Sequence, residues 1–256
     1  MNTSNKIIFV IPCYNEASRL KKIEFLSLLS NPDLDLIFVN DGSKDETELK
    51  LSELSNSSNG RIAYLSLSKN SGKAEAIRQG LLLALKNNPK YIGYTDADLS
   101  TPAQEILSFT QKASEQNQTI QMFLASRIRL LGTDIDRTLP RHILGRIFAT
   151  FASITLDLPV YDTQCGLKLL KNTEQIRNIL IEPFRTRWVF DVEIIGRLLT
   201  LPDSKLRLNI NHFYEIPIKQ WKDVGGSTLK IMGMLKAFID LMSLKRHLSK
   251  KRHAIR

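Results

Sequence analysis

The sequence predicts an α/β fold in which a mostly parallel sheet carries helices on both faces. Short, nearly continuous apolar runs alternate with stretches of helical spacing, which is typical of buried parallel strands and their crossover helices. Polar residues follow most of these runs, where the strands would leave the core. The expected strands are Lys6–Ile11, Asp35–Asn40, Arg61–Leu67, Tyr91–Thr95 and Ile120–Ala125.

The expected helices lie between these strands. In order they are Ala17–Ser30, a helix capped by Ser43 or Asp45 that ends near Leu54, Lys73–Lys86, and a helix that opens at Thr101-Pro102. Right-handed crossovers would place the carboxyl ends of the strands at one edge of the sheet. Open α/β sheets bind their ligands at that edge.

The alternation breaks after residue 127. A basic loop over 127–141 precedes a helix over 141–156, a loop and strand over 162–170, a helical stretch over 186–199 and a strand over 213–218. A last amphipathic helix begins near residue 228. We therefore expect one domain over residues 1–227, followed by a C-terminal helix and basic tail over residues 228–256.

Positive charge is concentrated in two segments of an otherwise nearly neutral chain. The net charge is +10 over 256 residues, and the segments 245–256 and 127–146 carry nine of those ten charges. A nucleic-acid-binding protein would show a broader basic surface, so we expect no nucleic-acid partner. Two basic segments instead favour anionic ligands at two places.

The sequence favours a cytoplasmic location. Its two cysteines give no disulfide framework and no zinc-ligand spacing. No stretch of about eighteen apolar residues is present, so no membrane-spanning helix is expected. Any membrane contact would then be peripheral, on the cytoplasmic face.

Four polar motifs follow four of the expected strands. The last, Asp96-Ala97-Asp98, places two carboxylates at i and i+2, which lie on the same side of an extended chain. Hard oxygen ligands of this kind suit Mg²⁺ or Mn²⁺ that shares a substrate phosphate. The alternative is an ordinary turn after a strand. The other motifs are Asn15-Glu16, Asp41 and Asn70-Ser71-Gly72-Lys73.

Several common site motifs are absent from the sequence. The residues before and after Ser71-Gly72-Lys73 do not complete a phosphate loop, and no glycine-rich dinucleotide fingerprint follows the first strand. A nucleophile elbow of serine hydrolases is missing as well. The four histidines are scattered and suggest no ligand set.

The ordered motifs resemble family 2 glycosyltransferases of the GT-A fold, over roughly residues 6–235. Those of the second half are most similar to the dolichyl- or polyprenyl-phosphate β-glucosyltransferase branch. The first-half motifs are Pro12-x-Tyr14-Asn15-Glu16, Val39-Asn40-Asp41-Gly42-Ser43, Asn70-x-Gly72-Lys73, Asp96-Ala97-Asp98 and Ser126-Arg127. The second-half motifs are Asp162-Thr163-Gln164-Cys165-Gly166-Leu167-Lys168-Leu169, Arg187-Trp188-x-Phe190-Asp191-Val192-Glu193 and Gly225-Gly226-Ser227.

The resemblance implies an inverting transfer of a sugar, glucose from UDP-glucose, to a polyprenyl or dolichyl phosphate. Asp96 and Asp98 would hold Mg²⁺ or Mn²⁺ against the diphosphate of the nucleotide sugar. The resemblance also implies a set of donor-binding residues, with helix capping as the alternative role of Asp41. This set is Pro12, Asn15, Glu16, Asp41, Lys73 and Asp96.

The implied acceptor phosphate needs cations, and five arginines lie in the segment after the fifth strand. The resemblance selects Arg127 as the phosphate ligand, with Arg137 or Arg141 as a second; a solvated surface role is the alternative for each. Asp191 matches the position where relatives that use hydroxyl acceptors place a base. Here we expect Asp191 to orient the acceptor or the sugar, Glu193 to give structural support, and Trp188 to lie in the core.

The last expected helix carries apolar residues on one side, beside a basic tail. Such a helix suits an anionic membrane surface, whereas the alternative is packing on the domain. Its apolar residues are Ile231, Met234, Leu235, Phe238, Leu241 and Met242.

Other functions remain open at this stage. The same fold could use GDP-mannose or UDP-GlcNAc, or a glycan hydroxyl as acceptor. A nucleotidyltransferase would need a glycine-rich basic loop where Pro12-Cys13-Tyr14-Asn15-Glu16 stands. A non-catalytic binding protein would have no need of the Asp96 and Asp98 pair.

Overall fold

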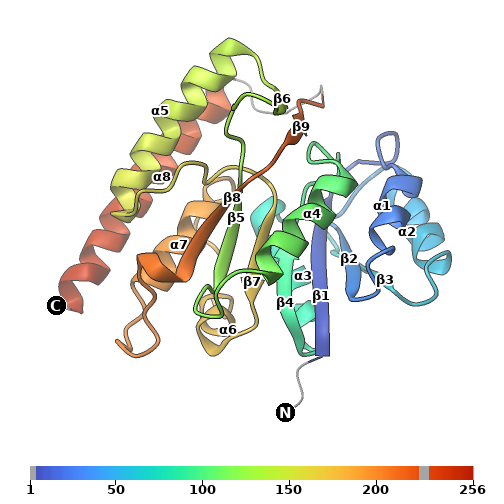
Figure 1. Ribbon diagram of the computed structural model, residues 1–256, viewed down its shortest axis with the longest axis horizontal. Coiled ribbons are helices and arrows are strands. Elements are labelled where there is room, and N and C mark those ends of the chain that lie inside the picture. The colour runs from blue at the N-terminus through green and yellow to red at the C-terminus, as the bar shows by residue number, and fades with distance from the viewer. Residues whose placement is uncertain (1–3, 225–230, 256) are drawn as a thin grey trace.

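The computed structural model describes residues 4–224 and 231–255, except for the side chains of Arg141 and of Ile231, Met232, Met234 and Leu235. Within these residues the centre of the fold is a seven-stranded sheet in the order β3-β2-β1-β4-β7-β5-β8 (Figure 1). The strands are β1 (Ser4–Cys13), β2 (Leu34–Asn40), β3 (Ile62–Ser66), β4 (Pro89–Tyr94), β5 (Met122–Ser126), β7 (Lys168–Lys171) and β8 (Phe213–Pro217).

All strands of this sheet are parallel except β7, which runs antiparallel to both of its neighbours. The predicted α/β fold with a mostly parallel sheet is therefore confirmed. The antiparallel strand has a consequence for function. It carries the residues just before β7, in the segment 162–167, to the edge where the carboxyl ends of β4 and β5 lie.

The helices are α1 (Lys22–Leu28), α2 (Thr47–Asn56), α3 (Lys73–Leu85), α4 (Ala103–Ser114), α5 (Leu139–Leu156), α6 (Glu174–Ile179), α7 (Phe190–Leu199) and α8 (Ile231–Ala254). A 3-10 turn, η1 (Ile210–His212), precedes β8. A small parallel pair, β6 (Asp134–Asp136) with β9 (Gln220–Lys222), joins the segment after β5 to the segment after β8.

Alternate side chains of β1 pack into two separate hydrophobic cores, one on each face of the sheet. Ile8 and Val10 belong to a core with α3, α5, α7 and α8. Ile7, Phe9 and Ile11 belong to a second core with α1, α2 and α4. Burial on both faces explains why this strand is a continuous apolar run rather than an alternating one.

Two expected helices begin later than their apolar spacing suggests. The helix expected over Ala17–Ser30 is restricted to α1, because residues 15–20 form a turn in which Asn15 adopts a φ of 53°. The helical stretch expected from residue 186 begins only at Phe190. The segments β6, β9 and α6 were not predicted, because short elements give little periodicity.

The last helix packs on the domain with the apolar face that the sequence assigns to a membrane. Leu241 is fully buried, and Phe238 and Met242 pack against the first core. The Phe238 ring lies 5.5 Å from that of Phe148 and 5.7 Å from that of Phe151, both on α5. This part of the membrane prediction is wrong. The same prediction for Ile231, Met234 and Leu235 lies outside the described side chains.

The basic tail belongs to the same helix. α8 continues to Ala254, and Arg252 donates a hydrogen bond to the Leu156 carbonyl at the end of α5. Among the described residues, no helix has the length and apolar content needed to cross a bilayer.

Gly93 allows β4 and β7 to approach each other closely. A Cβ at this position would lie 2.4 Å from the backbone oxygen of Lys168 and 2.7 Å from Cε1 of Phe9. We expect Gly93→Ala to destabilise the protein by about 1–3 kcal/mol, because the backbone of β7 cannot move away cheaply. Urea unfolding measures this change.

Gly60→Asn is a suitable control for that measurement. Gly60 has a φ of +79° with nothing within 4 Å of a Cβ, and asparagine tolerates this conformation. The control should change stability by less than about 1 kcal/mol. Wild-type stability of Gly93→Ala would contradict the close approach.

Candidate active site

The carboxyl ends of β1, β2 and β4 bring the predicted donor-binding residues to one edge of the sheet. Asp41, directly after β2, is buried and accepts hydrogen bonds from the amides of Ser71 (2.7 Å) and Gly72 (2.8 Å). Asp41 therefore does not cap α2, which was the alternative role. It instead holds the loop that leads into α3.

Gly42 makes this contact between loops possible. Its φ is +64°, and a Cβ here would lie 2.5 Å from the backbone carbon of Lys69. A side chain at this position would separate the two loops. The motif Asp41-Gly42 thus sets the position of residues 69–72.

The turn after β1 is bound to the turn after β2. Asn15 donates its amide to Ser43 Oγ at 3.0 Å and accepts the Lys44 amide with its side-chain oxygen at 2.8 Å. The Glu16 amide donates to Thr47 Oγ1 at 2.8 Å. Pro12 lies half-buried opposite Val39 in the β1–β2 pair. The two turns form one rigid wall of the site.

One carboxylate oxygen of Glu16 accepts a hydrogen bond from Arg19 at 2.6 Å, and the other is buried with no partner among the described residues. Burial raises the pKa of Glu16, Arg19 opposes this effect, and the carboxylates of Asp98 and Asp45 add to it. Glu16 and Asp98 are therefore close enough to repel each other. A cation near this pair would relieve that repulsion.

The extended conformation expected through Asp98 is not found, because β4 ends at Tyr94 and the Leu99 amide donates to the Asp96 carbonyl in a turn that contains both aspartates. Both are half-buried, whereas Thr95, Ala97 and Leu99 between and beside them are buried. Asp98 Oδ1 accepts both the amide (2.9 Å) and the hydroxyl (2.8 Å) of Ser100. These bonds orient Asp98, whose second oxygen accepts no hydrogen bond from the residues that the structure describes.

Asp96 forms an ion pair with Lys73 at the start of α3, with 2.5 Å between Nζ and Oδ1. Burial opposes ionisation of Asp96, but Lys73, helped by Lys168 and Arg127, outweighs burial and keeps the pKa of Asp96 below its ordinary value. Burial lowers the pKa of Lys73, but Asp96, helped by Asp191 and Asp98, outweighs burial and raises that pKa. Asp96 is an anion and Lys73 a cation at neutral pH.

Gly166 leaves space for the Asp96 carboxylate. A Cβ on Gly166 would lie 2.0 Å from Oδ2 of Asp96, so any larger residue would displace this carboxylate. This explains the glycine of the motif Asp162-Thr163-Gln164-Cys165-Gly166. The sequence did not predict the contact between Gly166 and Asp96, because Gly166 lies seventy residues after Asp96.

Arg127 is engaged by Asp162 of the same motif. Nε and Nη2 donate to the two carboxylate oxygens at 2.7 and 2.9 Å, and the Arg127 amide adds a third bond at 3.1 Å. Both side chains are about nine-tenths buried, and the guanidinium lies 5.0 Å from the Trp221 ring. Despite burial, Arg127 keeps the pKa of Asp162 well below its usual range.

The pairing bears on the predicted role of Arg127. Two of its nitrogens are committed to Asp162, so a phosphate could be bound by the remaining Nη1. The Asp162 carboxylate also accepts the amides of Gln164 and Cys165. It therefore fixes both Arg127 and the loop that makes room for Asp96.

Asp191, at the start of α7, belongs to a buried network. Its Oδ1 accepts the Tyr94 hydroxyl at 2.7 Å and lies 3.2 Å from Nζ of Lys168. Lys168 has no exposed surface and also donates to the Cys165 carbonyl. Sequence reasoning missed Lys168 as a site residue. The signal was a lysine within the apolar stretch Leu167-Lys168-Leu169-Leu170.

The remaining predicted arginines are spread over α5 and the loop before it. Arg137 lies against α5, where a Cβ on Gly145 would come within 2.4 Å of its Nη2. The Arg141 side chain lies outside the described residues. Arg146 donates to the Tyr161 carbonyl at 2.9 Å and stacks on the Tyr161 ring at 3.8 Å. Arg129 is exposed.

Two expectations for the motif before α7 have different outcomes. Glu193 is buried and accepts bonds from the amides of Arg185 and Thr186 and from Arg197, so its structural role is confirmed. Trp188 is 38% exposed, so the expectation that it lies in the core is wrong. Helix α7 begins after it, which leaves Trp188 in the surface loop.

The carboxylates of the site fit a divalent cation that shares a substrate. Among the described residues, no three His, Cys, Asp or Glu side chains are grouped to hold a metal alone. Mg²⁺, however, usually takes one or two carboxylates and completes its shell with water and phosphate oxygens. Asp96, which lies against Gly166, and the second oxygen of Asp98 provide such a pair. Within the described part of the chain, one oxygen of Glu16 also has no partner.

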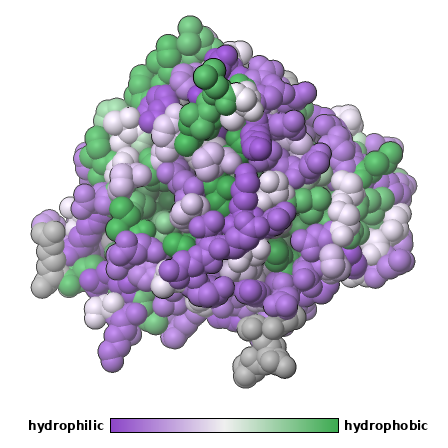
Figure 2. Space-filling view, viewed as in Figure 1, coloured by the Kyte–Doolittle hydropathy of each residue, from purple (hydrophilic) through white to green (hydrophobic). Residues whose placement is uncertain are grey.

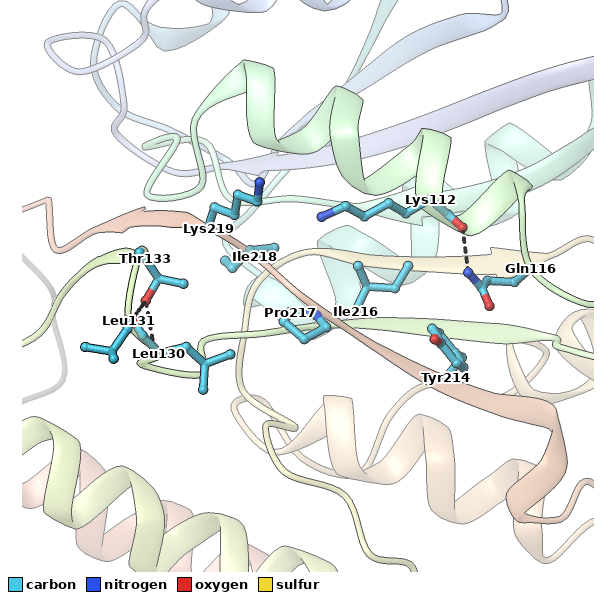
Figure 3. Close-up of a pocket in the computed structure, with 11 residues that line it drawn as sticks. Lys112, Gln116, Leu130, Leu131, Thr133, Tyr214, Ile216, Pro217, Ile218 and Lys219 are labelled. Atoms are coloured by element: carbon cyan, nitrogen blue, oxygen red, sulfur yellow. Dashed lines mark hydrogen bonds between the residues drawn. The ribbon is translucent and has the colours of Figure 1, made fainter.

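A separate pocket of about 530 Å³ opens beside β8, between α4 and the loop before β6 (Figure 3). Apolar side chains of β8 and of the loop line it, and Lys112 and Lys219 reach over it from the α4 side. None of the carboxylates described above lines this pocket. Its residues are therefore separate from the site at the strand ends.

Comparison with known proteins agrees with this geometry. The family model described as "Glycosyl transferase family 2" matches residues 8–167. A dolichyl-phosphate beta-glucosyltransferase of Trichomonas vaginalis is 31% identical over 248 residues, which cover 92% of this chain and 69% of the relative. A protein of the same description from Saccharomyces cerevisiae is 30% identical over 92% of this chain and 73% of its own.

The fold is also found in solved structures. Glucosyl-3-phosphoglycerate synthase of Mycobacterium tuberculosis in complex with UDP superposes with a TM-score of 0.67 and 17% identity, over 94% of this chain and 80% of the other. The same enzyme in complex with Mn²⁺, UDP-glucose and phosphoglyceric acid gives a TM-score of 0.66. At this identity the likeness establishes the fold alone.

Removing Asp162 should destabilise the protein strongly. Asp162→Asn leaves the buried Arg127 without its counter-charge, which costs about 3–5 kcal/mol. Asp134→Asn, at an exposed carboxylate of β6, should change stability by no more than about 0.5 kcal/mol. Urea unfolding at neutral pH compares the two variants, and equal stabilities would contradict a stabilising pair.

The pair should also appear in the pH dependence of stability. Because the folded pKa of Asp162 is depressed, its contribution is complete above the unfolded value of about 3.9 and is lost as the pH falls through the folded value. Between about pH 5 and pH 2, the free energy of unfolding should therefore fall more steeply in the wild type than in Asp162→Asn. Parallel curves would contradict the depressed pKa.

Proposed function

Because the chain belongs to glycosyl transferase family 2, we propose that it transfers glucose from UDP-glucose to the phosphate of a polyprenyl or dolichyl phosphate. The observation that carries the proposal is the pair Asp96 and Asp98 after β4, in which Asp96 lies against Gly166 and forms an ion pair with Lys73. Support for the sugar and the lipid comes from relatives named dolichyl-phosphate beta-glucosyltransferase. Support for the donor comes from a solved neighbour in complex with UDP-glucose.

The donor would lie over the carboxyl ends of β1, β2 and β4. Pro12, Asn15 and Glu16 would form one wall around the base and ribose, and Asp41 would lie against the nucleoside across from them. Asp41 already accepts two amides, and a carboxylate retains further lone pairs for a base or ribose donor. Lys73, beside Asp96, would contact the diphosphate.

A divalent metal, Mg²⁺ or Mn²⁺, would be held by Asp96 and Asp98 and would neutralise charge that builds on the departing nucleotide. The chain itself prepares that position. Lys73, Arg127 and Lys168 keep Asp96 ionised despite its burial. Ser100 orients Asp98 through two hydrogen bonds.

The acceptor phosphate would be bound through Arg127, with Arg137 or Arg141 as a second cation. A phosphate monoester has a second pKa near 6, so it is largely ionised at neutral pH. One of its oxygens would attack the anomeric carbon as the bond from that carbon to the UDP oxygen breaks. A single in-line displacement inverts the anomeric configuration and releases UDP.

No strong general base is required for this step, because the nucleophile is already an anion. Asp191 then has a positioning role rather than a proton-transfer role. Its contacts with Tyr94 and Lys168 suit this role, since both hold the carboxylate in one orientation. The acceptor class thus determines which role this aspartate has.

A screen of donors and acceptors tests the proposal. We expect UDP release from UDP-glucose to depend on added polyprenyl phosphate and to exceed release from GDP-mannose or UDP-GlcNAc by at least about tenfold. The lipid product should contain a β-linked hexose by NMR. Preference for another donor, or for a glycan hydroxyl over the lipid phosphate, would contradict the proposed substrates.

Asp98→Asn should lower kcat/KM by about 10²–10³, because the site loses the carboxylate that has no ion pair within the described chain. Asp134→Asn, outside the site, should match the wild type. Chelation of divalent metal should abolish wild-type transfer, and added Mn²⁺ or Mg²⁺ should restore it. Near-normal activity of Asp98→Asn with metal present would contradict the assignment.

A further inference from the structure

Exposed apolar side chains are concentrated on α5 and the loop that precedes it. Of the 17 large hydrophobic residues that are exposed in the described part of the chain, six lie on this one helix, and each of the six is 38–69% exposed. Two more lie in the loop before β6, where Leu131 is fully exposed, and one lies on α8. They are Leu130, Leu131, Leu139, Ile143, Leu144, Ile147, Phe151, Ile154 and Ile239.

These residues form a continuous stripe, which we call the α5 face. Leu139, Ile143, Ile147, Phe151 and Ile154 follow one another at spacings of three or four, so they lie along one side of the helix. Figure 2 shows hydrophobic atoms along the upper left margin, where α5 lies in Figure 1. The opposite side of α5 packs inward through Phe148, Ala152 and Leu156.

The charge on α5 and α8 themselves is mostly positive, whereas the exposed carboxylates of Asp134, Asp136 and Asp157 lie in the segments that flank α5. The 18 residues of α5 contain two arginines and no carboxylate, and the 24 residues of α8 contain six Lys or Arg and one aspartate. On α8, Lys236, Arg246 and Lys250 are exposed on the same side as Ile239. At the other end, Lys112 and Lys219 reach over the pocket that Leu130 and Leu131 help to line (Figure 3).

We infer that the α5 face docks on an anionic bilayer surface. Apolar side chains flanked by cations are the arrangement by which helices bind at the interface of anionic membranes. A second copy of this chain is a poorer occupant, because it would bring two strongly basic surfaces together. The inference relocates the membrane contact from the face of α8, which the core covers, to α5.

The orientation of the helix is consistent with a site that receives a lipid phosphate. The start of α5 lies at the same end of the molecule as the carboxyl ends of β1, β2 and β4 (Figure 1). The segment that begins at Arg127 leads from the end of β5 through β6 to the start of α5. A bilayer on the α5 face would therefore lie next to the predicted acceptor arginines. The docking inference itself rests on exposure and charge and does not require the proposed sugar transfer.

Flotation of the full chain with vesicles tests this inference. We expect it to float with vesicles of phosphatidylcholine and phosphatidylglycerol, to float weakly with phosphatidylcholine alone, and to be released by high salt. Ile147→Glu/Ile154→Glu should lower the bound fraction by about tenfold. Circular dichroism and urea unfolding verify that this variant is folded.

The matched control places the same two changes on exposed isoleucines elsewhere. Ile23 on α1 and Ile210 in η1 are 84% and 52% exposed. Ile23→Glu/Ile210→Glu should bind vesicles like the wild type. Equal loss in both double variants, or no flotation of the wild type, would overturn the inference. So would a wild-type dimer that becomes monomeric only in the α5 variant, because a second copy would then cover the face.

Transfer to a short-chain polyprenyl phosphate in detergent separates this inference from the proposed function. The α5 variant should retain wild-type transfer there, since none of the changed residues contacts the site. Vesicle binding without any transfer by the wild type would leave docking standing and contradict the proposed function. Transfer by the wild type without vesicle binding would contradict docking and leave the proposed function standing.

Discussion

Pairing of buried and half-buried carboxylates with cations is the constraint on which the site depends. Asp96 pairs with Lys73, Asp162 with Arg127, and Asp191 with Lys168. Each pair joins segments that are distant in the sequence. Removal of one partner would leave the other unpaired, in a buried position for the Arg127–Asp162 and Lys168–Asp191 pairs and in a half-buried one for the Lys73–Asp96 pair. Asp98 has no ion pair among the described residues, and Glu16 keeps one buried oxygen without a partner. The remaining negative charge is the physical basis for a cation at this edge.

The antiparallel strand β7 makes these pairings possible. A strand that entered the sheet in the common direction would leave residues 162–167 at the opposite edge. Because β7 runs the other way, Asp162 reaches Arg127, Gly166 frees space for Asp96, and Lys168 lies beneath Asp191. The motif Asp-Thr-Gln-Cys-Gly thereby acquires a structural meaning. It is the support that holds the aspartate proposed to bind the metal and the arginine proposed to bind the phosphate.

The sequence predicted the strands of the main sheet and most of the first-half helices, because these follow from local periodicity. It identified Asp96 and Asp98 but did not predict the turn in which they lie. It did not predict the role of Lys168 or the Arg127–Asp162 pair. Arg127 and Asp162 are 35 residues apart, and only the antiparallel direction of β7 brings them together. It also placed the membrane contact on α8. Periodicity shows that a helix has an apolar side, but both α5 and α8 are amphipathic. Only the packing of Phe238 on α5 shows which of the two sides is covered.

The central claim is that Asp96 and Asp98 bind a divalent metal together with a nucleotide diphosphate. Titration calorimetry with UDP, in the presence and absence of Mn²⁺, measures this coupling directly. The account predicts that Mn²⁺ tightens UDP binding at least about tenfold, or about 1.4 kcal/mol, and that Asp96→Asn/Asp98→Asn loses this gain. Equal UDP affinity with and without Mn²⁺, or the same gain in the double variant, would contradict it.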